Sequence, residues 1–593
     1  SQGEGIVGGP SVGDHSKFAR NTADEVALSS STIPTATAAK LKTPNLMNKS
    51  QKRALFDAIQ RPVSLIQGPP GTGKTRTACN ILSTVVQLKH NRLRDGGLRA
   101  QGFKTLKLLA VAHSNVATDN LLDGLLQQGV KVVRIGRPTS VRPALWAYTL
   151  DARLQLEPSW LSVKEKVDAA RIQVEDAMAE DGPEALEQCK RRLQFALKRL
   201  AKVEKQAAIN VLKDADIVVS TCVGSGGELL KDFTSSEQVR FSTVLVDEAA
   251  QCVESAVLPA VVHHCDQLIL VGDQNQLPPV VMSPAAADEG FGISLFARLV
   301  AAGLKPSLLQ TQYRMHPTIA QFSSKEFYNG RLADGVTKSE RPRPLLPNTG
   351  PFSWPHPDEP VAFLDTCQVA TAHLDAGGAW DENFEGGADD DARKLEATAS
   401  ASDTSYLNAV EADCVVAVVQ ALMKADSSLT LSDIGVISPY AAQVRRMTEL
   451  FRDAGMLQDP DFEVEGSAAA MLSRSTSTPT ATGVYEGVLE IRTVDGFQGR
   501  EKEVIIISTV RSNPRRQLGF LKDWRRLNVG ITRARRGLVV LGDGNTLRAD
   551  ERWRAFVRWC VRNGCSRQLD VNALKALGIK PAVPTVMDDI EIL

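Results

Sequence analysis

A glycine-rich stretch near the start of the chain has the composition of a phosphate-binding loop. Residues 68–75 follow the pattern G-x-x-x-x-G-K-T, after a short apolar run at 63–66 that is typical of a buried parallel strand. Glycines let successive backbone N–H groups turn towards phosphate oxygens, and the helix expected from Lys74 onwards adds its positive N-terminal end. Lys74 can then reach the β- and γ-phosphates, and the Thr75 hydroxyl can ligate Mg²⁺. The sequence therefore predicts a nucleoside triphosphate site made by Gly68, Pro69, Pro70, Gly71, Thr72, Gly73, Lys74 and Thr75.

Two carboxylates end a second run of strand-forming residues. Asp247 and Glu248 follow the run 243–246, which is rich in β-branched and apolar side chains. Ligands of open α/β sheets bind at the carboxyl ends of the strands, so both carboxylates are expected opposite the phosphate loop. Asp247 would there hold Mg²⁺, and Glu248 would orient and deprotonate the attacking water.

Further polar residues are placed to act on the same nucleotide. Gln51 lies in a helix expected from about Asn45, just before the phosphate loop, and its amide can both donate to and accept from an adenine edge. The alternative for Gln51 is a surface position without a ligand. Gln276 follows an expected strand at 267–272 and can contact the γ-phosphate, while Arg314 is expected to be buried.

Composition limits the class of protein that can position these residues. At roughly 100–200 residues per domain, 593 residues predict three or four units. Lys+Arg and Asp+Glu balance at 69 each, so a nucleic-acid site must come from local clusters of charge. The nine cysteines form no C-x-x-C pair, which gives no signal of a zinc module or a disulfide framework. No apolar run has the length of a membrane span and no signal peptide is evident, so we expect a cytoplasmic protein, with the nucleus as the alternative.

The order of the expected elements predicts two α/β lobes, each with a parallel sheet. The first lobe is expected at 45–335, with strands at 63–66, 107–112, 130–135, 216–220, 243–248 and 267–272. A proline-rich connection at 336–360 leads to a second lobe at 361–568, with strands at 361–365, 434–440, 488–493, 504–509 and 538–541. Low-complexity composition predicts disorder at 1–44 and in insertions at 369–404 and 458–483, and 569–593 is expected to be a tail.

Residues 160–208 have a different pattern. Apolar residues recur at steps of four and three on both sides of a break at 180–183, which predicts an antiparallel helical hairpin inserted in the first lobe. The second arm of this hairpin carries a series of cations: Lys190, Arg191, Arg192, Lys198, Arg199, Lys202 and Lys205. They form either a solvated face or a clamp on a phosphate backbone.

Taken together, these motifs resemble the superfamily 1 helicases, in the branch of the nonsense-mediated mRNA decay (up-frameshift) helicase. The resemblance covers about 45–565 and is carried by the stretches 61–75, 220–224, 270–273, 312–317 and 496–502. It implies two RecA-like, P-loop NTPase domains with ATP between them, and a hairpin subdomain that embraces the nucleic acid. It also implies an ATPase stimulated by single-stranded RNA or DNA, with 5′-to-3′ movement.

The resemblance also assigns residues. It places Gln51 at the adenine and Tyr313 against the adenine face, and Gln276 as a γ-phosphate sensor. Arg314 and Arg533 correspond to arginine fingers, and Glu501 to a contact on the nucleotide side. Lys74, Thr75, Asp247 and Glu248 keep the roles derived above. The positions where the family touches the strand are Ser114, Asn115, Thr221, Pro439, Tyr440, Thr493 and Asp495.

We therefore predict an ATP- and Mg²⁺-dependent helicase or translocase on single-stranded RNA, with DNA as a further substrate, acting as a monomer without a membrane. Its expected setting is RNA metabolism such as nonsense-mediated decay, with protein partners of RNA decay or processing. Two alternatives stay open. One is a DNA repair or replication helicase, and the other is a nucleotide-gated RNA-binding scaffold without strong unwinding.

Overall fold

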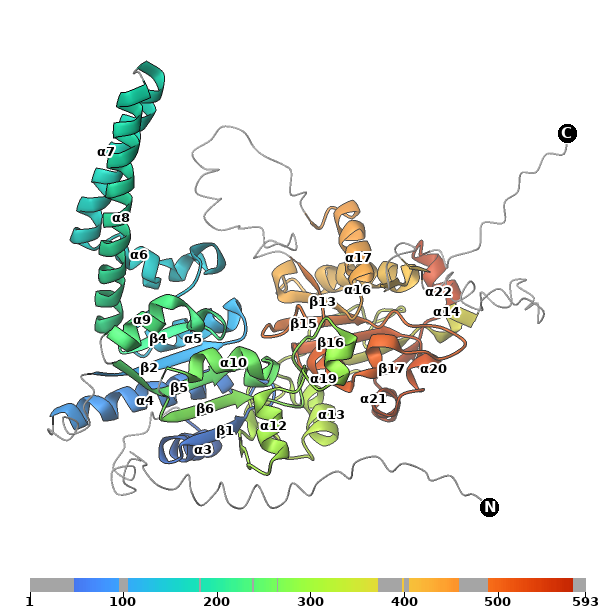
Figure 1. Cartoon of the computed structure of the whole chain (residues 1–593). Helices are drawn as coiled ribbons and strands as arrows, with labels where there is room; N and C mark the ends of the chain where they lie inside the picture. Colours follow the sequence, from blue (N-terminus) through green and yellow to red (C-terminus); the bar gives the residue numbers. More distant parts are fainter. Residues whose placement is uncertain are drawn as a thin grey trace, which may run out of the picture.

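The computed structural model of the chain describes residues 47–94, 105–180, 183–236, 239–263, 265–371, 397–398, 405–457 and 489–579. The predicted segments 1–44 and 458–483 lie outside these residues, as does most of the predicted insertion 369–404. The described part forms two α/β lobes that lie side by side, with a long helical arm rising from the first lobe (Figure 1). This arrangement confirms the predicted fold class.

The first lobe is built on a parallel sheet with seven strands among the described residues. The strand order is β3-β4-β2-β5-β6-β1-β7. The strands are β1 (Val63–Gln67), β2 (Thr105–Ala112), β3 (Val132–Arg134), β4 (Ile217–Thr221), β5 (Val239–Asp247), β6 (Gln267–Gly272) and β7 (Ser307–Leu308). Only β6 separates β1 from β5. The phosphate loop after β1 and the carboxylates after β5 are therefore brought to one edge of the sheet, as predicted.

Both faces of this sheet are covered by helices, because alternate side chains of a strand point to opposite faces. On one face, Leu108 and Ala110 of β2 pack with α3 (Lys49–Gln60), α4 (Lys74–Arg94) and α5 (Asn115–Leu126). On the other, Leu109 and Val111 pack with α9 (Glu228–Ser236), α10 (Glu254–Val261) and α12 (Leu295–Ala301). The apolar runs seen in the sequence are thus strands buried on both faces.

The second lobe has a parallel sheet with six strands within the described ranges, in the order β14-β13-β15-β16-β10-β17. The strands are β10 (Val361–Asp365), β13 (Ile434–Ser438), β14 (Glu490–Thr493), β15 (Lys502–Ser508), β16 (Ala534–Gly542) and β17 (Ser566–Gln568). Helices α16 (Ala409–Ala425) and α17 (Ala441–Asp453) cover one face, and α19 (Trp524–Ile531) and α21 (Glu551–Arg562) cover the other.

Two predicted boundaries differ from the packing. Helix α13 (Pro317–Phe327) falls within the predicted first lobe, but Ile319 and Phe322 share the core of the second lobe with Phe363 and Phe556. The chain therefore crosses between the lobes before α13. At the other end, the predicted tail includes α22 (Val571–Ala576), whose Leu574 packs into the second core. The sequence could not place these helices because each packs its apolar side chains against segments far away in the chain.

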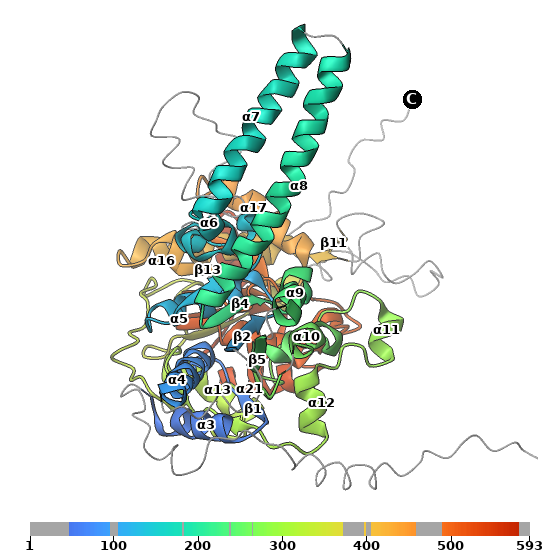
Figure 2. The same ribbon diagram turned by 60° about the vertical axis from the view of Figure 1, so that its left-hand side comes forward.

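The helical arm consists of α7 (Pro158–Glu180) and α8 (Pro183–Asp214), so it is longer than the predicted 160–208. The end of α8 is anchored, since Ala207 and, beyond the predicted end, Val211 and Leu212 are buried in the core of the first lobe. Val163 and Val167 of the predicted seam are buried between the two helices. Figure 2 shows the arm projecting well beyond the sheets. Among the helices that the structure describes, none combines the length and the apolar character of a membrane span.

Candidate nucleotide-binding and catalytic site

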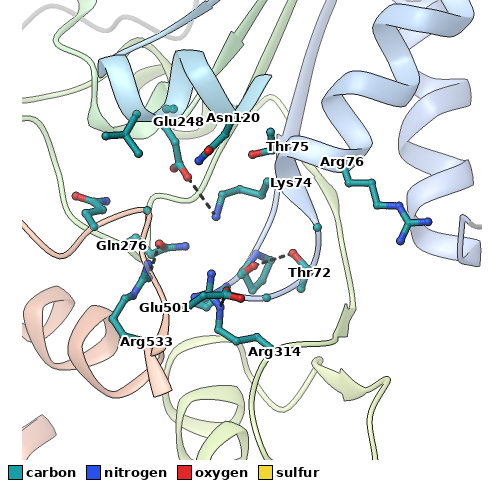
Figure 3. A pocket seen from close by; sticks show the side chains of 18 of the residues that line it. Thr72, Lys74, Thr75, Arg76, Asn120, Glu248, Gln276, Arg314, Glu501 and Arg533 are labelled. Carbon is teal, nitrogen blue, oxygen red and sulfur yellow. Dashed lines mark hydrogen bonds and ion pairs between the residues drawn. The ribbon is translucent and has the colours of Figure 1, made fainter. Parts of the chain in front are cut away.

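A cavity of about 310 Å³ lies between the two lobes, with residues of both in its wall (Figure 3). Phosphate-loop residues Pro69–Thr75 form one side together with Glu248 and Gln276. Tyr313, Arg314, Glu501 and Arg533 form the other. Most residues predicted to bind or hydrolyse a nucleotide are thus brought together, although they lie hundreds of positions apart.

The phosphate loop takes the shape that its glycines were expected to allow. Gly71 and Gly73 have φ values of 73° and 77°, in the left-handed region that L side chains rarely adopt. At Gly68 a Cβ atom would lie 2.0 Å from the side chain of Lys74. Lys74 Nζ donates to the Gly68 carbonyl at 2.9 Å and lies 3.8 Å from a carboxylate oxygen of Glu248. The lysine is therefore aimed into the cavity between the loop and the carboxylate.

Thr75 and Asp247 form the candidate magnesium site. The Thr75 hydroxyl donates to the Asp247 carboxylate at 2.9 Å. Burial, and then the negative charge of Glu248, raises the pKa of Asp247. A hydroxyl and a carboxylate are hard oxygen ligands of the kind that Mg²⁺ binds beside substrate phosphates, so these two residues fit the ion. A bound cation would also offset the cost of keeping Asp247 ionised.

The sequence predicted a strand that includes Glu248. In the structure the strand ends at Asp247, and Glu248 follows it in a left-handed conformation with φ of 51°. A non-glycine residue in this region carries a strain of about 1–3 kcal/mol, which is typical of functional sites. The conformation is held by a bond from the Glu248 N–H to Asp247 at 2.9 Å and by one from Gln251 Nε2 to Glu248 at 2.8 Å. The second carboxylate oxygen is left facing Lys74, where an attacking water would be positioned.

Arg533 reaches the first lobe from the second. Its guanidinium donates to the Gln276 side chain at 3.2 Å, and the residue is only 2% exposed. Burial, and then the positive charge of Arg314, lowers the pKa of Arg533 to about 9, which still leaves the guanidinium charged at neutral pH. The predicted γ-phosphate sensor and the predicted arginine finger are therefore in direct contact across the cleft.

Asp273 organises the neighbourhood of Gln276 and was not predicted as a site residue. Its carboxylate accepts from Gln276 at 2.8 Å, from the Tyr328 hydroxyl at 2.7 Å and from Gln67 at 3.2 Å. Asn528 of α19 donates in turn to the Tyr328 hydroxyl at 3.0 Å. Burial raises the pKa of Asp273. The stretch 270–273 had marked this position by family resemblance, but its partners could not be found from local sequence.

Arg314 and Glu501 form an ion pair at the rim of the cavity. Arg314 also donates to the Thr532 carbonyl at 3.0 Å, one residue before Arg533. Burial alone would raise the pKa of Glu501, but the charge of Arg314 and its hydrogen bond lower it. In this conformation Glu501 and the Thr532 carbonyl hold the Arg314 guanidinium in the wall of the cavity.

The two residues predicted to contact adenine lie together at the other end of the loop. Gln51 is buried, accepts from the Asn48 N–H at 3.1 Å and donates to the Thr72 carbonyl at 3.1 Å. Asn48 caps α3, which is why this helix begins at Lys49 rather than near Asn45. Tyr313 accepts from Asn48 Nδ2 at 3.0 Å. The adenine contacts stay predictions; the Gln51 amide keeps a second lone pair on Oε1 and a second N–H on Nε2 for them.

The residues predicted to touch nucleic acid lie at the carboxyl ends of strands in both lobes. Ser114 caps α5 and also lines the nucleotide cavity, and Asn115 accepts from Arg134 at 3.0 Å. The Thr221 and Thr493 hydroxyls each accept a backbone N–H three residues on. These contacts to a strand stay predictions.

Within the second lobe, the Pro439–Tyr440 turn follows β13. Asp495 lies 3.3 Å from Arg526 in an ion pair. Tyr440 is 1% exposed and donates its hydroxyl to the Leu518 carbonyl, so its side chain supports the turn rather than offering a ring to a strand. Any contact at this position would be made by the backbone or by Pro439.

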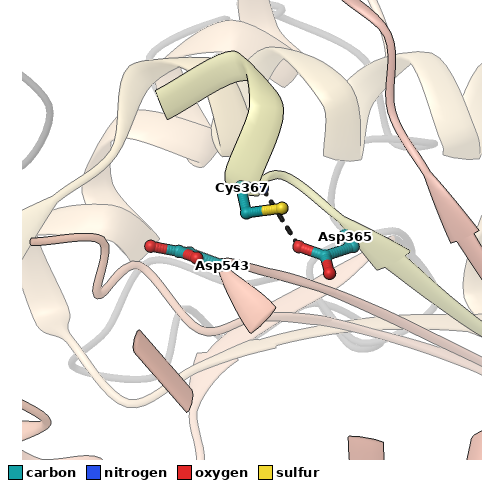
Figure 4. A group of neighbouring side chains, drawn as sticks. All are labelled: Asp365, Cys367 and Asp543. Atoms are coloured by element: carbon teal, nitrogen blue, oxygen red, sulfur yellow. Dashed lines mark hydrogen bonds between the residues drawn. The ribbon is translucent and has the colours of Figure 1, made fainter. Parts of the chain in front are cut away.

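Asp365, Cys367 and Asp543 form a second group of potential ligands, at the carboxyl ends of the neighbouring strands β10 and β16 (Figure 4). Asp365 accepts the N–H groups of Cys367 and Gly544 at 3.0 and 2.9 Å. Asp543 caps α20 (Gly544–Leu547) by accepting from the backbone N–H of Asn545. We therefore interpret the group as caps of two short helices.

Comparison with known proteins agrees with the site. Two protein-family models, each described as an AAA domain, match residues 46–284 and 291–545. The regulator of nonsense transcripts 1 homolog of Arabidopsis thaliana is 34% identical over 89% of this chain and 35% of its own length. The ATP-dependent helicase NAM7 of Saccharomyces cerevisiae is 32% identical over 88% of this chain and 44% of its own.

The chain belongs to the superfamily 1 helicases of the nonsense-mediated decay branch. It spans between about a third and a half of the length of these curated relatives. Among solved structures, an arterivirus helicase aligns over 84% of this chain and 62% of its own, with 13% identity and a TM-score of 0.31, which is too low to carry an argument.

Proposed function

We propose that this chain is an ATP-driven helicase that moves along single-stranded RNA, in the 5′-to-3′ direction, and that it acts in mRNA decay. The observation that carries the proposal is the contact between Arg533 of the second lobe and Gln276 of the first, in the wall of one cavity. A hydrolytic site completed by both lobes couples the state of the nucleotide to their relative position. The names of the relatives, ATP-dependent helicase and regulator of nonsense transcripts, support the same function.

The residues of the cavity divide the chemical work. The phosphate-loop N–H groups and Lys74 bind the phosphates, and Thr75 and Asp247 would hold Mg²⁺, which neutralises charge on the phosphate oxygens. Glu248 orients a water and takes its proton. Arg314 and Arg533 donate to the phosphoryl oxygens on which charge develops. Gln276 contacts the γ-phosphate, and when that phosphate leaves, its change of position is transmitted to Arg533 through their hydrogen bond. Each round of closing and opening then changes the spacing between the strand contacts of the two lobes.

Paired ATPase and strand-displacement measurements test the proposal. ATP hydrolysis should rise when single-stranded RNA is added, and a duplex with a 5′ single-stranded overhang should be opened faster than one with a 3′ overhang. Matched DNA substrates show whether RNA is preferred. Stimulated hydrolysis without displacement from either overhang would instead support a nucleotide-gated scaffold, and an ATPase that ignores both nucleic acids would contradict the proposal.

A further inference from the structure

The outer face of α8 carries an exposed aromatic ring surrounded by positive charge. Phe195 is 71% exposed, although apolar side chains of this arm mostly pack along the seam. Side chains three and four positions apart are neighbours on a helix surface. For Phe195 these four neighbours are all cations and all exposed: Arg191, Arg192, Lys198 and Arg199. We call these five residues the basic–aromatic face.

This arrangement is unfavourable in the isolated arm. Like charges three or four residues apart destabilise a helix. An exposed phenyl ring also lacks the stabilisation that burial of its apolar surface would contribute. Arg191 is paired with Glu187 at 3.4 Å. Within the described part of the chain, Arg192, Lys198 and Arg199 have no acidic partner in an ion pair. A partner that supplies negative charge and a flat apolar surface would therefore stabilise this face.

The other arm provides an internal comparison. Ile172 of α7 is 57% exposed, but its helical neighbours include Asp168, Glu175 and Asp176. An exposed apolar side chain on this hairpin is thus not always surrounded by cations. The clustering of four cations around the one exposed aromatic ring of α8 is a property of that face.

We infer that the basic–aromatic face binds single-stranded nucleic acid, with a base stacked on Phe195 and the flanking phosphates on the four cations. The inference rests on the proposed function and extends its binding surface along the arm. Stacking platforms between cations are the general means by which proteins hold single strands without reading their sequence. A duplex offers phosphates but keeps its bases stacked inside, so it would leave Phe195 without a partner.

The position of the face sets the length of strand that it can reach. Phe195 lies twelve residues from Ala207, where α8 enters the core, which is roughly 18 Å along the helix axis. None of the residues of the face lines the cavity between the lobes, and Figure 2 shows α8 running away from the sheets. A strand would need to span at least this distance to contact the lobes and the face together, so we expect a short strand to miss the face and a longer strand to reach it.

Binding of short and long single strands to the full chain tests this. With an RNA of about 8 nucleotides, within the range that single-strand-binding folds cover, Phe195→Ala should bind like the unmodified chain. With an RNA several times longer, Phe195→Ala should lose about 5- to 150-fold in affinity, the range measured for removing one stacking partner. Phe195→Trp should restore affinity and Phe195→Leu should not. Ile172→Ala is the matched control and should leave both affinities unchanged.

The outcomes separate the inference from the function on which it rests. If the unmodified chain binds both strands and Phe195→Ala still binds the long strand normally, the stacking role is overturned while the helicase proposal stands. If the unmodified chain binds neither strand, the proposed function itself fails. An equal loss on a long duplex would show that Phe195 does not stack on bases. A Phe195-dependent affinity for poly-glutamate that matches the affinity for RNA would assign the face to an acidic protein instead.

Discussion

The residues around the cavity show which chemistry a local sequence can reveal. Lys74 was predicted from the phosphate-loop pattern, and Asp247 and Glu248 from their place at the carboxyl end of an apolar run, since the carboxyl ends of parallel strands meet. The pairs Arg314–Glu501 and Tyr328–Asp273 join residues 187 and 55 positions apart, and no local pattern indicates them. The left-handed conformation of Glu248 was equally hidden, because glutamate has no preference for it.

Glu248→Gln should abolish most turnover while ATP still binds. The amide keeps the size of the side chain but cannot take the proton of water, and a positioned general base typically contributes about 10²–10⁴ in rate. Affinity should persist because Thr75 and Asp247, joined at 2.9 Å, are untouched. Steady-state ATPase rates beside equilibrium binding of a fluorescent ATP analogue measure the two effects.

Lys74→Ala is the companion variant and should lose both turnover and nucleotide affinity. Lys74 and Glu248 lie at the rim of the sheet rather than in its core, so the melting temperature of both variants should stay close to that of the unmodified chain. Hydrolysis near the normal rate in either variant would remove the proposed roles.

At the scale of elements, the strands were predictable and the pairing of helices with lobes was not. Runs such as 243–246 and 504–507 are buried on both faces of a parallel sheet, so they are apolar throughout and stand out in the sequence. Helix α13 has an amphipathic pattern that fits either lobe. Its place was decided by Phe322 meeting Phe556, a contact between residues more than 200 positions apart.

The arm gives a prediction that depends on salt. Replacing Lys198, Arg199 and Lys202 together with Ala should flatten the salt dependence of RNA binding, because each lost phosphate contact lowers the logarithmic slope by roughly 0.7 on a single strand. Fluorescence anisotropy over a range of KCl concentrations measures the slope. A matched triple replacement of Asp168, Glu175 and Asp176 in α7 should not flatten it. An unchanged slope in the lysine–arginine variant would show that these three side chains form a solvated face and do not contact phosphates.

The start of α13 gives a prediction that depends on pH. His316 is 2% exposed, and its Nδ1 accepts the Thr318 N–H at 3.2 Å. Burial lowers the pKa of His316 to about 4, although Glu359 opposes the shift. Between pH 6.5 and 4 the unfolded chain therefore binds a proton that the folded chain does not. The histidine thus makes the free energy of unfolding fall as the pH falls, by about 1.4 kcal/mol per unit and by about 3 kcal/mol in total.

His316→Asn should reduce this loss, because asparagine supplies an N-cap acceptor and does not titrate. Thermal melts of both proteins at several pH values between 7 and 4 provide the comparison. The difference between the two curves isolates the histidine from the carboxylates that titrate in the same range. Parallel curves would show that His316 is not kept neutral by the fold.

At the scale of the whole molecule, the decisive feature is that neither lobe contains a complete site. The phosphate loop, Asp247 and Glu248 belong to the first lobe, while Arg533 comes from the second and meets Gln276 at 3.2 Å. The sequence predicted both lobes and most residues of the cavity wall, but not Asp273. It could not predict where the chain crosses between them, because the crossing near 312–316 carries site residues rather than a linker composition.

Arg533→Ala tests whether ATP hydrolysis requires a residue of the second lobe. An arginine supplied across a cleft stabilises the transition state only when the cleft closes, and such arginines contribute about 10³–10⁵ in rate. Turnover should fall by that order while nucleotide affinity changes far less. Arg533→Lys should not rescue it, because an ammonium lacks the planar fork that matches phosphoryl oxygens. Arg535→Ala, which removes a pair with Glu503 at 2.9 Å, is the nearby control and should be milder. Normal RNA-stimulated hydrolysis by Arg533→Ala would contradict a site completed by both lobes.

The anchoring of α8 in the first core gives the molecule a lever. Because Ala207, Val211 and Leu212 are fixed in that core, the arm must turn with the first lobe as one body. A rigid-body rotation of about 10°, smaller than the roughly 15° of a subunit rotation such as that of haemoglobin, carries a point about 18 Å from its axis through about 3 Å. The rise of one nucleotide in a stacked strand is about 3.4 Å. An opening of the cleft by such an angle would therefore displace Phe195, relative to the second lobe, by a distance comparable to one nucleotide if Phe195 lies about 18 Å from the axis, and by more if it lies farther away.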